Sequence, residues 1–248
     1  IINIDDPKKP FRVGVYELDT PGHSIHDVWI EDGIAYSSNW ADGIVAVDIG
    51  AKKHKESDRS KSQFNPLLAK AGQGSPSNPV KLAEMKDPTG RNHAAFPYLN
   101  EETGQFYIIG GDENFPWGVQ ATKNKPSNPR GGYHFMNFTD PNNPREDAIY
   151  EVPEAGSHNL WIYGDILLAG NYQGGLRIVD ISGELLGDIY KQGREIAHYL
   201  SYHKDGRIPN APMVWGAQPY KDYIFFSDMN SGLYCVAYED EQKTASAE

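Results

Sequence analysis

The stretch from Ser157 to Ser182 recurs in shifted copies, and this repetition restricts the fold more than any other feature of the chain. Moved back by 132 positions, it falls on His26 to Ile49 without a gap, and moved forward by 57 it falls on Trp215 to Tyr238. A fourth copy begins at His93, is broken by an insertion and resumes at Gly132. The first positions, 26, 93, 158 and 215, are 67, 65 and 57 residues apart. Such a period is typical of solenoids, propellers and other arrays.

Each copy has the residue pattern of short β-strands joined by tight turns. Segments such as Ile34 to Ser37 and Leu176 to Val179 are rich in β-branched or aromatic residues and are bounded by Gly, Asp and Asn. The connection from Asn39 to Gly43 returns as Asn171 to Gly175. Its Asx residue can hydrogen-bond to the backbone downstream, and its glycine can take a positive φ. These features predict hairpins and no helices.

A further strand-like segment precedes each copy, so each repeat unit is expected to contain four strands. These segments are Arg12 to Tyr16, Val80 to Glu84, Asp147 to Glu151 and Arg194 to Tyr199. A four-stranded antiparallel unit matches the blade of a β-propeller. We therefore predict an all-β fold with four propeller blades over residues 1–238, followed by a polar tail at 239–248.

The opening residues, Ile1 to Pro7, align with the final strand of a copy, but the two strands that should come before it are missing. One orphan strand added to four sets of four does not suit a closed four-bladed ring. The sequence therefore predicts the C-terminal part of a larger propeller, of roughly six to eight blades. Its N-terminal blades and any signal peptide would then lie outside this chain.

Four segments carry a resemblance to a known family. GIVAVDI, GGLRIVDIS and the opening IINIDDPKKPFRVGVY resemble the LVIVD repeat family of bacterial β-propellers, and the stretch from Gly193 to Tyr234 resembles the closing part of such proteins. The likeness covers nearly the whole chain apart from two insertions and the tail. It implies a propeller exported to the periplasm, the cell surface or the extracellular space. Because propellers host many unrelated functions, it implies no particular reaction.

Charge and composition exclude several classes of partner. The formal net charge of −11 argues against nucleic acid and anionic membranes, which favour a basic surface. No apolar run approaches the roughly 18 residues needed to span a membrane. The common hydrolase, kinase and dehydrogenase signatures are also missing from the sequence, so no catalytic residue is predicted.

Two insertions interrupt the repeats. The first, 51–79, is polar and is expected to be either a solvated loop or a segment that docks a partner. The second, 112–130, lies between the second and third strands of its unit and points to the rim that we call the top. Its residues Asp112, Glu113 and Trp117 are predicted to form a binding site with Trp215. Asp112 and Glu113 could bind Ca²⁺ through oxygen ligands, although the spacing of an EF-hand is absent.

Three histidines, His26, His93 and His158, each open an innermost strand at its top end. One interpretation is structural: a histidine that recurs once per blade would hydrogen-bond to a backbone carbonyl or a carboxylate of an adjacent blade. The other is that the three imidazoles bind a transition metal such as Zn, Cu or Fe. No other cofactor is predicted.

The sequence is compatible with two functions. The first is an exported binding or assembly module that recognises a protein or polymer through its top face and insertions. Its partner could equally be its own N-terminal blades or another copy, because a truncated array leaves a blade edge exposed. The alternative is a metal-dependent enzyme, oxidoreductase-like, with His26, His93 and His158 as ligands.

Overall fold

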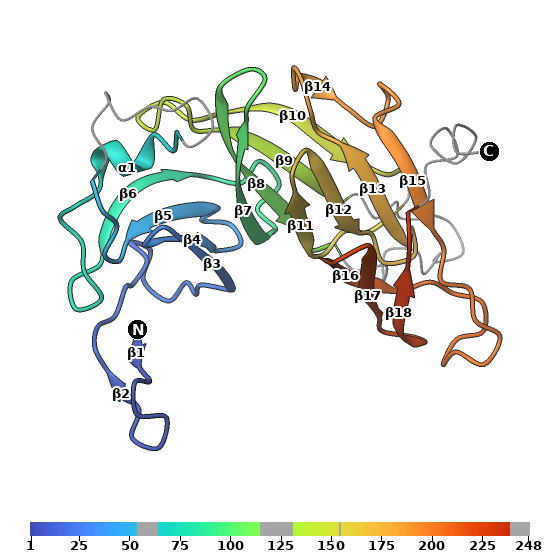
Figure 1. The fold of residues 1–248 in the computed structure, drawn as a ribbon, viewed down its shortest axis with the longest axis horizontal. Coiled ribbons are helices and arrows are strands. Elements are labelled where there is room, and N and C mark those ends of the chain that lie inside the picture. The colour runs from blue at the N-terminus through green and yellow to red at the C-terminus, as the bar shows by residue number, and fades with distance from the viewer. Residues whose placement is uncertain (54–63, 115–130, 154, 239–248) are drawn as a thin grey trace. The chain divides into compact units, whose positions relative to one another are not determined.

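The computed structural model describes residues 1–53, 64–114, 131–153 and 155–238 of the chain (Figure 1). The predicted binding residue Trp117, most of the second insertion and the tail lie outside these residues. The chain forms two compact units, which are described separately. The first comprises residues 1–113, 133–150 and 182–188, and the second comprises the rest. No helix in the described ranges is long and apolar enough to cross a membrane.

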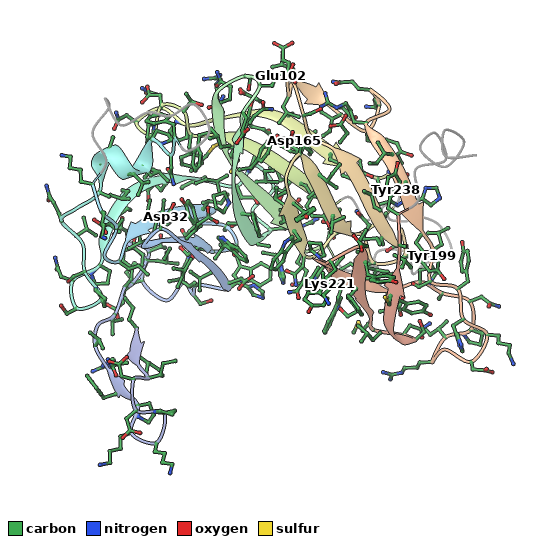
Figure 2. All side chains as sticks on the ribbon, in the orientation of Figure 1. Asp32, Glu102, Asp165, Tyr199, Lys221 and Tyr238 are labelled. Carbon is green, nitrogen blue, oxygen red and sulfur yellow. The ribbon has the colours of Figure 1, made fainter. Side chains whose placement is uncertain are left out.

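The first sheet of unit 1 contains four antiparallel strands in the order in which they occur in the chain, as a propeller blade requires. They are β3 (Asp27–Glu31), β4 (Ile34–Ser38), β5 (Ile44–Asp48) and β6 (Val80–Met85). The turn between β3 and β4 holds Asp32 at φ 51° and Gly33 at φ 76°, the backbone shape that a two-residue hairpin needs. Figure 2 labels Asp32, and it labels Glu102, Asp165 and Lys221 at the corresponding turns of the other sheets.

The second sheet of unit 1 contains β7 (Asn92–Asn100), β8 (Gln105–Asp112), β9 (Gly132–Asn137) and β10 (Arg145–Glu151), and one strand more. The grouping of strands was predicted wrongly: the fourth strand of a sheet follows its copy in the sequence, and the segment that precedes the copy at His93 completes the first sheet as β6. The additional strand, β14 (Gly187–Asp188), pairs with β10 in the parallel direction. It was not predicted, because a two-residue strand has no alternation to detect.

A small hairpin precedes these sheets in the chain. Its strands are β1 (Ile2–Asn3) and β2 (Phe11–Arg12), which pair with each other and form a sheet of their own. The strand expected from Arg12 to Tyr16 is therefore wrong in extent and in pairing: of these residues only Arg12 lies in a strand, and that strand is not part of a blade sheet. Phe11 is 60% exposed and Val15 51% exposed, so this segment lacks the apolar cover that would extend the strand.

Unit 2 contains two further antiparallel sheets. One has four strands, β11 (Leu160–Tyr163), β12 (Ile166–Gly170), β13 (Leu176–Asp180) and β15 (Glu195–Tyr199). The other has three, β16 (Val214–Tyr220), β17 (Tyr223–Asp228) and β18 (Gly232–Val236). Among the described residues, this last sheet has no fourth, outermost strand.

The described part of the first insertion is packed against the protein, which corrects the expectation of a solvated loop. A short helix, α1 (Leu67–Lys70), buries Leu67 and Leu68. Asn65 stabilises the start of this helix, because its Oδ1 accepts a hydrogen bond from the Leu67 N–H. Its side-chain amide also donates a hydrogen bond to the Tyr36 hydroxyl. Four residues give too short an apolar pattern for a helix to be predicted.

Asp48 holds the far end of this insertion to the end of β5. Its Oδ1 accepts hydrogen bonds from the N–H groups of Gly50 and Ala51, and its Oδ2 accepts from those of residues 72–74. Asp48 therefore caps the turn that follows β5. The same carboxylate anchors a segment more than 20 residues away in the sequence.

The aromatic residues three positions after the histidines pack between sheets. In unit 1 the rings of Trp29 and Phe96 lie 4.2 Å apart, joining β3 to β7. In unit 2 Trp161 packs against a core that includes Leu168, Val214 and Phe226. The fold class is therefore confirmed: apart from the short helix α1 the chain is all-β, and it has four sheets of the four-bladed propeller type, antiparallel except where β14 joins β10.

Candidate functional site

Three predicted residues of unit 1 come together: His26 and His93, expected as metal ligands, and Glu113, expected as a binding residue. One ligand atom from each lies within 4.8 Å of the others. The rings of His26 and His93 have centroids 4.0 Å apart, and His93 Nε2 is 3.8 Å from Glu113 Oε2. His26 is exposed, Glu113 is half-buried and His93 is buried. We call these three residues the histidine–glutamate cluster.

The ends of three strands position this cluster. His26 directly precedes β3, and its N–H donates to the Ser38 carbonyl at the end of β4. Glu113 directly follows β8, and its N–H donates to the Arg91 carbonyl just before β7. The pairing of β7 with β8 therefore brings Glu113 alongside His93 near the start of β7.

A hydrogen bond sets the tautomer of His26. Its Nδ1 lies 3.1 Å from the His93 carbonyl oxygen, which also accepts a hydrogen bond from Ser38 Oγ. Because a carbonyl oxygen only accepts, His26 Nδ1 carries the proton. In the neutral ring, Nε2 is then left with its lone pair. The Trp40 ring meets His26 edge-on at 4.5 Å and forms an apolar wall beside it.

His158 and Trp215 lie in unit 2, where they repeat this hydrogen bond. His158 Nδ1 is 3.0 Å from the Trp215 carbonyl oxygen, and the two rings stack at 5.3 Å and 7°. The hydrogen bond to a backbone carbonyl in the next sheet, one of the two interpretations of the repeated histidines, is thus present for His26 and for His158. His158 is buried, whereas Trp215 is 39% exposed.

A second group in unit 1 is buried: Asp87, Asp112 and His134. One ligand atom from each lies within 4.8 Å of the others. His134 Nε2 is 3.2 Å from Asp112 Oδ2, and His134 Nδ1 is 2.5 Å from Glu146 Oε1 on β10. We call Asp87, Asp112 and His134 the buried cluster.

This cluster corrects the placement of Asp112. The residue was expected on a loop, but it is the last residue of β8 and only 1% exposed. Its side chain is therefore turned into the protein, away from any surface ligand. Glu113, the next residue, contributes to the histidine–glutamate cluster instead.

Burial and neighbouring charges shift the pKa values in the buried cluster. Burial alone would lower the pKa of His134, but its hydrogen bonds with Asp112 and Glu146 raise that pKa to about 10. Burial raises the pKa of Asp87, and the neighbouring Asp112 raises it further. Burial also favours a higher pKa for Asp112, but the hydrogen bond with His134 holds it below the usual range.

Asp87, His134 and Glu146 were not predicted as site residues, although the repeat contains a signal for one of them. His134 lies three residues before Asn137, as Val45 lies before Asp48 and Arg177 before Asp180. Arg177 pairs with Glu195 of its neighbouring strand at 3.0 Å, just as His134 pairs with Glu146. At this position of the repeat the first copy has a valine, whereas two later copies have a side chain that can carry charge. That difference could have identified His134 as a candidate site residue.

Comparisons with known proteins support the fold and no more. No protein-family model matches the chain, and no curated protein matches it. The chain is similar to the computationally designed Ika4 protein, at a TM-score of 0.50 and 10% identity, over 90% of this chain and 96% of that one. It is less similar to the designed Ika8 protein, at a TM-score of 0.49 and 12% identity, over 87% of this chain and 46% of that one. The similarity to the AfRom2 CNH domain has a TM-score of 0.35 and 13% identity, over 95% of this chain and 63% of that one.

The similarity to Ika4 and the sheet topology define the class: this chain has the fold of a four-bladed β-propeller. That it is the C-terminal part of a larger propeller stays a prediction. A propeller is consistent with a binding or assembly module, and it does not specify which one. Nothing in the comparisons identifies the LVIVD repeat family, so that resemblance remains a prediction.

Proposed function

We propose that this propeller is a binding module whose ligand-binding centre is a divalent transition-metal ion held by His26, His93 and Glu113. The observation that carries the proposal is the convergence of one ligand atom from each residue within 4.8 Å, beside the exposed ring of His26. Two imidazoles and one carboxylate suit Zn²⁺, Fe²⁺ or Cu²⁺. In this proposal Glu113 is the third metal ligand, whereas the sequence had suggested His158.

The hydrogen bond of His26 supports this assignment. A metal-binding histidine usually donates its other ring N–H to a carbonyl or a carboxylate, which orients the ring and fixes the tautomer. His26 makes such a bond through Nδ1 to the His93 carbonyl. Its Nε2 lone pair is therefore available without rearrangement of the backbone.

The chemistry of the partner follows from the number of ligands. Three protein ligands leave at least one coordination position of a tetrahedral ion open. A carboxylate or an imidazole of a protein or polymer partner could fill that position from the exposed side of His26. Ca²⁺ is a poorer candidate here, because it prefers six to eight oxygen ligands.

Replacing Glu113 by glutamine should weaken Zn²⁺ binding at this centre by about 100-fold, because the amide loses the charge that a Zn²⁺ ligand needs. Equilibrium titration with Zn²⁺ measures the loss, and His26→Gln should give a comparable one. His23→Gln is the matched control. Like His93, His23 lies beside one carboxylate, in this case that of Asp42, but among the described residues it belongs to no group of three possible ligands. Equal affinities for wild type and Glu113→Gln would contradict the proposal.

A metal-dependent enzyme is the second candidate. Two histidines and one carboxylate with open positions form the ligand set of non-haem iron oxygenases, which favours redox chemistry. One measurement separates the two candidates: with Fe²⁺ added and ascorbate as the electron donor for O₂ reduction, wild type consumes O₂ faster than the Glu113→Gln protein only in the second case. Equal rates, together with metal retained by wild type, favour the binding module.

An assembly role at the incomplete sheet of unit 2 is part of the same proposal. The outer edge of β18 has no paired strand among the described residues, and Leu233 on it is 76% exposed. An open edge of this kind accepts a strand from another molecule. We take that molecule to be a second copy of this chain, because its own β18 presents the same unpaired edge and two such edges can pair symmetrically.

Leu233→Lys should then shift the protein from dimer to monomer, because a charge on the edge opposes strand pairing. Light scattering after size-exclusion chromatography measures the mass, with Tyr163→Lys, an exposed residue of β11 in the other sheet of unit 2, as the control. A wild-type monomer at all concentrations would exclude the second copy and leave N-terminal blades of a larger propeller as the occupant. Export to the periplasm or cell surface of a bacterium remains part of the proposal and rests on the family resemblance.

A further inference from the structure

We propose that Asp87, Asp112 and His134 form a second divalent-cation site, buried in unit 1 and separate in its residues from the histidine–glutamate cluster. One ligand atom from each residue lies within 4.8 Å of the others, and all three side chains are buried. They come from the segment that follows β6, from the end of β8 and from β9. An ion at this point would join three parts of the chain that are distant in the sequence.

The first argument is that neighbouring groups already orient each prospective ligand from behind. Asp87 Oδ1 accepts hydrogen bonds from the N–H groups of Thr89 and Gly90, and Asp112 Oδ1 accepts one from the Thr89 hydroxyl. His134 Nδ1 is bound to Glu146. A carboxylate behind a histidine and donors behind the carboxylates are the outer contacts that metal sites use to orient their ligands.

The second argument is that one carboxylate oxygen of Asp87 is buried without a hydrogen-bond partner among the described residues. Its side chain is 7% exposed, yet its Oδ2 accepts no hydrogen bond from any residue that the structure describes. A buried carboxylate oxygen without a partner is costly and rare in proteins. A cation beside Asp87 Oδ2 would remove this cost.

The donor set identifies the class of ion. Two carboxylates and one imidazole suit Zn²⁺ or Mn²⁺, whereas Ca²⁺ prefers six to eight oxygen atoms. The ion would take the place of the proton that now lies between His134 Nε2 and Asp112 Oδ2, 3.2 Å apart. Without a metal, a protonated His134 neutralises the same carboxylates, so a metal-free ion cluster is the alternative.

Zinc stoichiometry distinguishes this site from the proposed binding centre. Full-length protein carrying both His26→Gln and Glu113→Gln lacks the first centre, so after dialysis against Zn²⁺ it should retain one ion per chain by elemental analysis. Adding Asp87→Asn should remove that ion, because asparagine keeps Oδ1 for Thr89 and Gly90 but replaces the free oxygen with an amide. Asp140→Asn, which alters an exposed turn, should leave it in place.

Two readouts keep the test decisive if Asp87→Asn folds poorly. Co²⁺ bound to the double variant should give a visible absorption band, and EDTA should lower its unfolding midpoint. A double variant that retains no zinc, or whose midpoint does not respond to EDTA, overturns this site and leaves the metal-free cluster. One ion in both the wild type and the double variant supports the buried site and rejects the histidine–glutamate centre, so the two failures are distinguishable.

Discussion

Replacing Asp48 by asparagine is expected to lower the free energy of unfolding by about 2–4 kcal/mol. The side chain is fully buried, and its two oxygens accept hydrogen bonds from five backbone N–H groups. An asparagine side chain keeps one acceptor oxygen, which can serve the N–H groups of Gly50 and Ala51. Its NH₂ group then faces the N–H groups of residues 72–74. The donors of Gly72 and Gly74 would then be left facing an amide that cannot accept.

The effect should depend on pH in a direction that follows from the carboxylate. Burial alone would raise the pKa of Asp48, but the hydrogen bonds from the N–H groups of Gly50, Gly74 and their neighbours lower it below the ordinary value. A lowered folded-state pKa stabilises the protein above the unfolded-state pKa of about 4, and this contribution is lost as the pH falls further. The advantage of wild type over Asp48→Asn should thus be constant near neutrality and shrink below about pH 4.

Urea unfolding of both proteins at neutral and acidic pH measures these two effects. Asp140→Asn is the matched control, because Asp140 also caps a turn through Asn142 but is exposed, and its unfolding midpoint should stay close to that of wild type. If Asp48→Asn unfolds at the same urea concentration as wild type, the anchoring of the insertion by Asp48 is refuted.

Gly170→Ala should destabilise the protein by about 3–5 kcal/mol, because the added methyl group has no space. A Cβ at this position would lie 2.5 Å from the Trp215 carbonyl oxygen and 2.9 Å from the Gly216 nitrogen, both backbone atoms. The same carbonyl accepts hydrogen bonds from His158 Nδ1 and from the Asn159 N–H. Moving β16 away from β12 would therefore weaken both contacts as well.

Thermal and chemical unfolding measure this change, and Gly164→Asn provides the comparison within unit 2. Gly164 has φ 55° and nothing within 4 Å of an added Cβ, and asparagine tolerates this backbone shape. Its stability should remain close to wild type. A Gly170→Ala protein as stable as Gly164→Asn would show that β12 and β16 approach less closely than described.

The strands and hairpins could be predicted from the sequence because their signals are local and recur. The connection from Asn39 to Gly43 closes as expected, with the Asn39 N–H donating to the Gly43 carbonyl, and Asn171 does the same with Gly175. Repetition allowed a weak pattern in one copy to be checked against the others. Strand β14 and helix α1 escaped prediction because neither repeats and both are too short for a periodic pattern to be recognised.

The candidate sites were harder to predict, because they depend on how separate strands are placed. His26, His93 and Glu113 were each singled out, but their grouping needs the pairing of β7 with β8 and the contact between β3 and β7. Asp87 and His134 are 47 positions apart, and neither lies in a short motif. Only the three-dimensional arrangement shows that both face Asp112.

The way in which the chain divides between its two units bears on how it must fold during synthesis. The chain passes from one unit to the other after residues 113, 132, 150, 181 and 188, so neither unit is formed by one continuous segment. Unit 1 receives its last strand, β14, only when residue 188 has left the ribosome. Nascent chains usually fold domain by domain from the N-terminus. This protein should instead remain protease-sensitive until residue 188 has been translated, and no single cut of its gene would yield either unit alone.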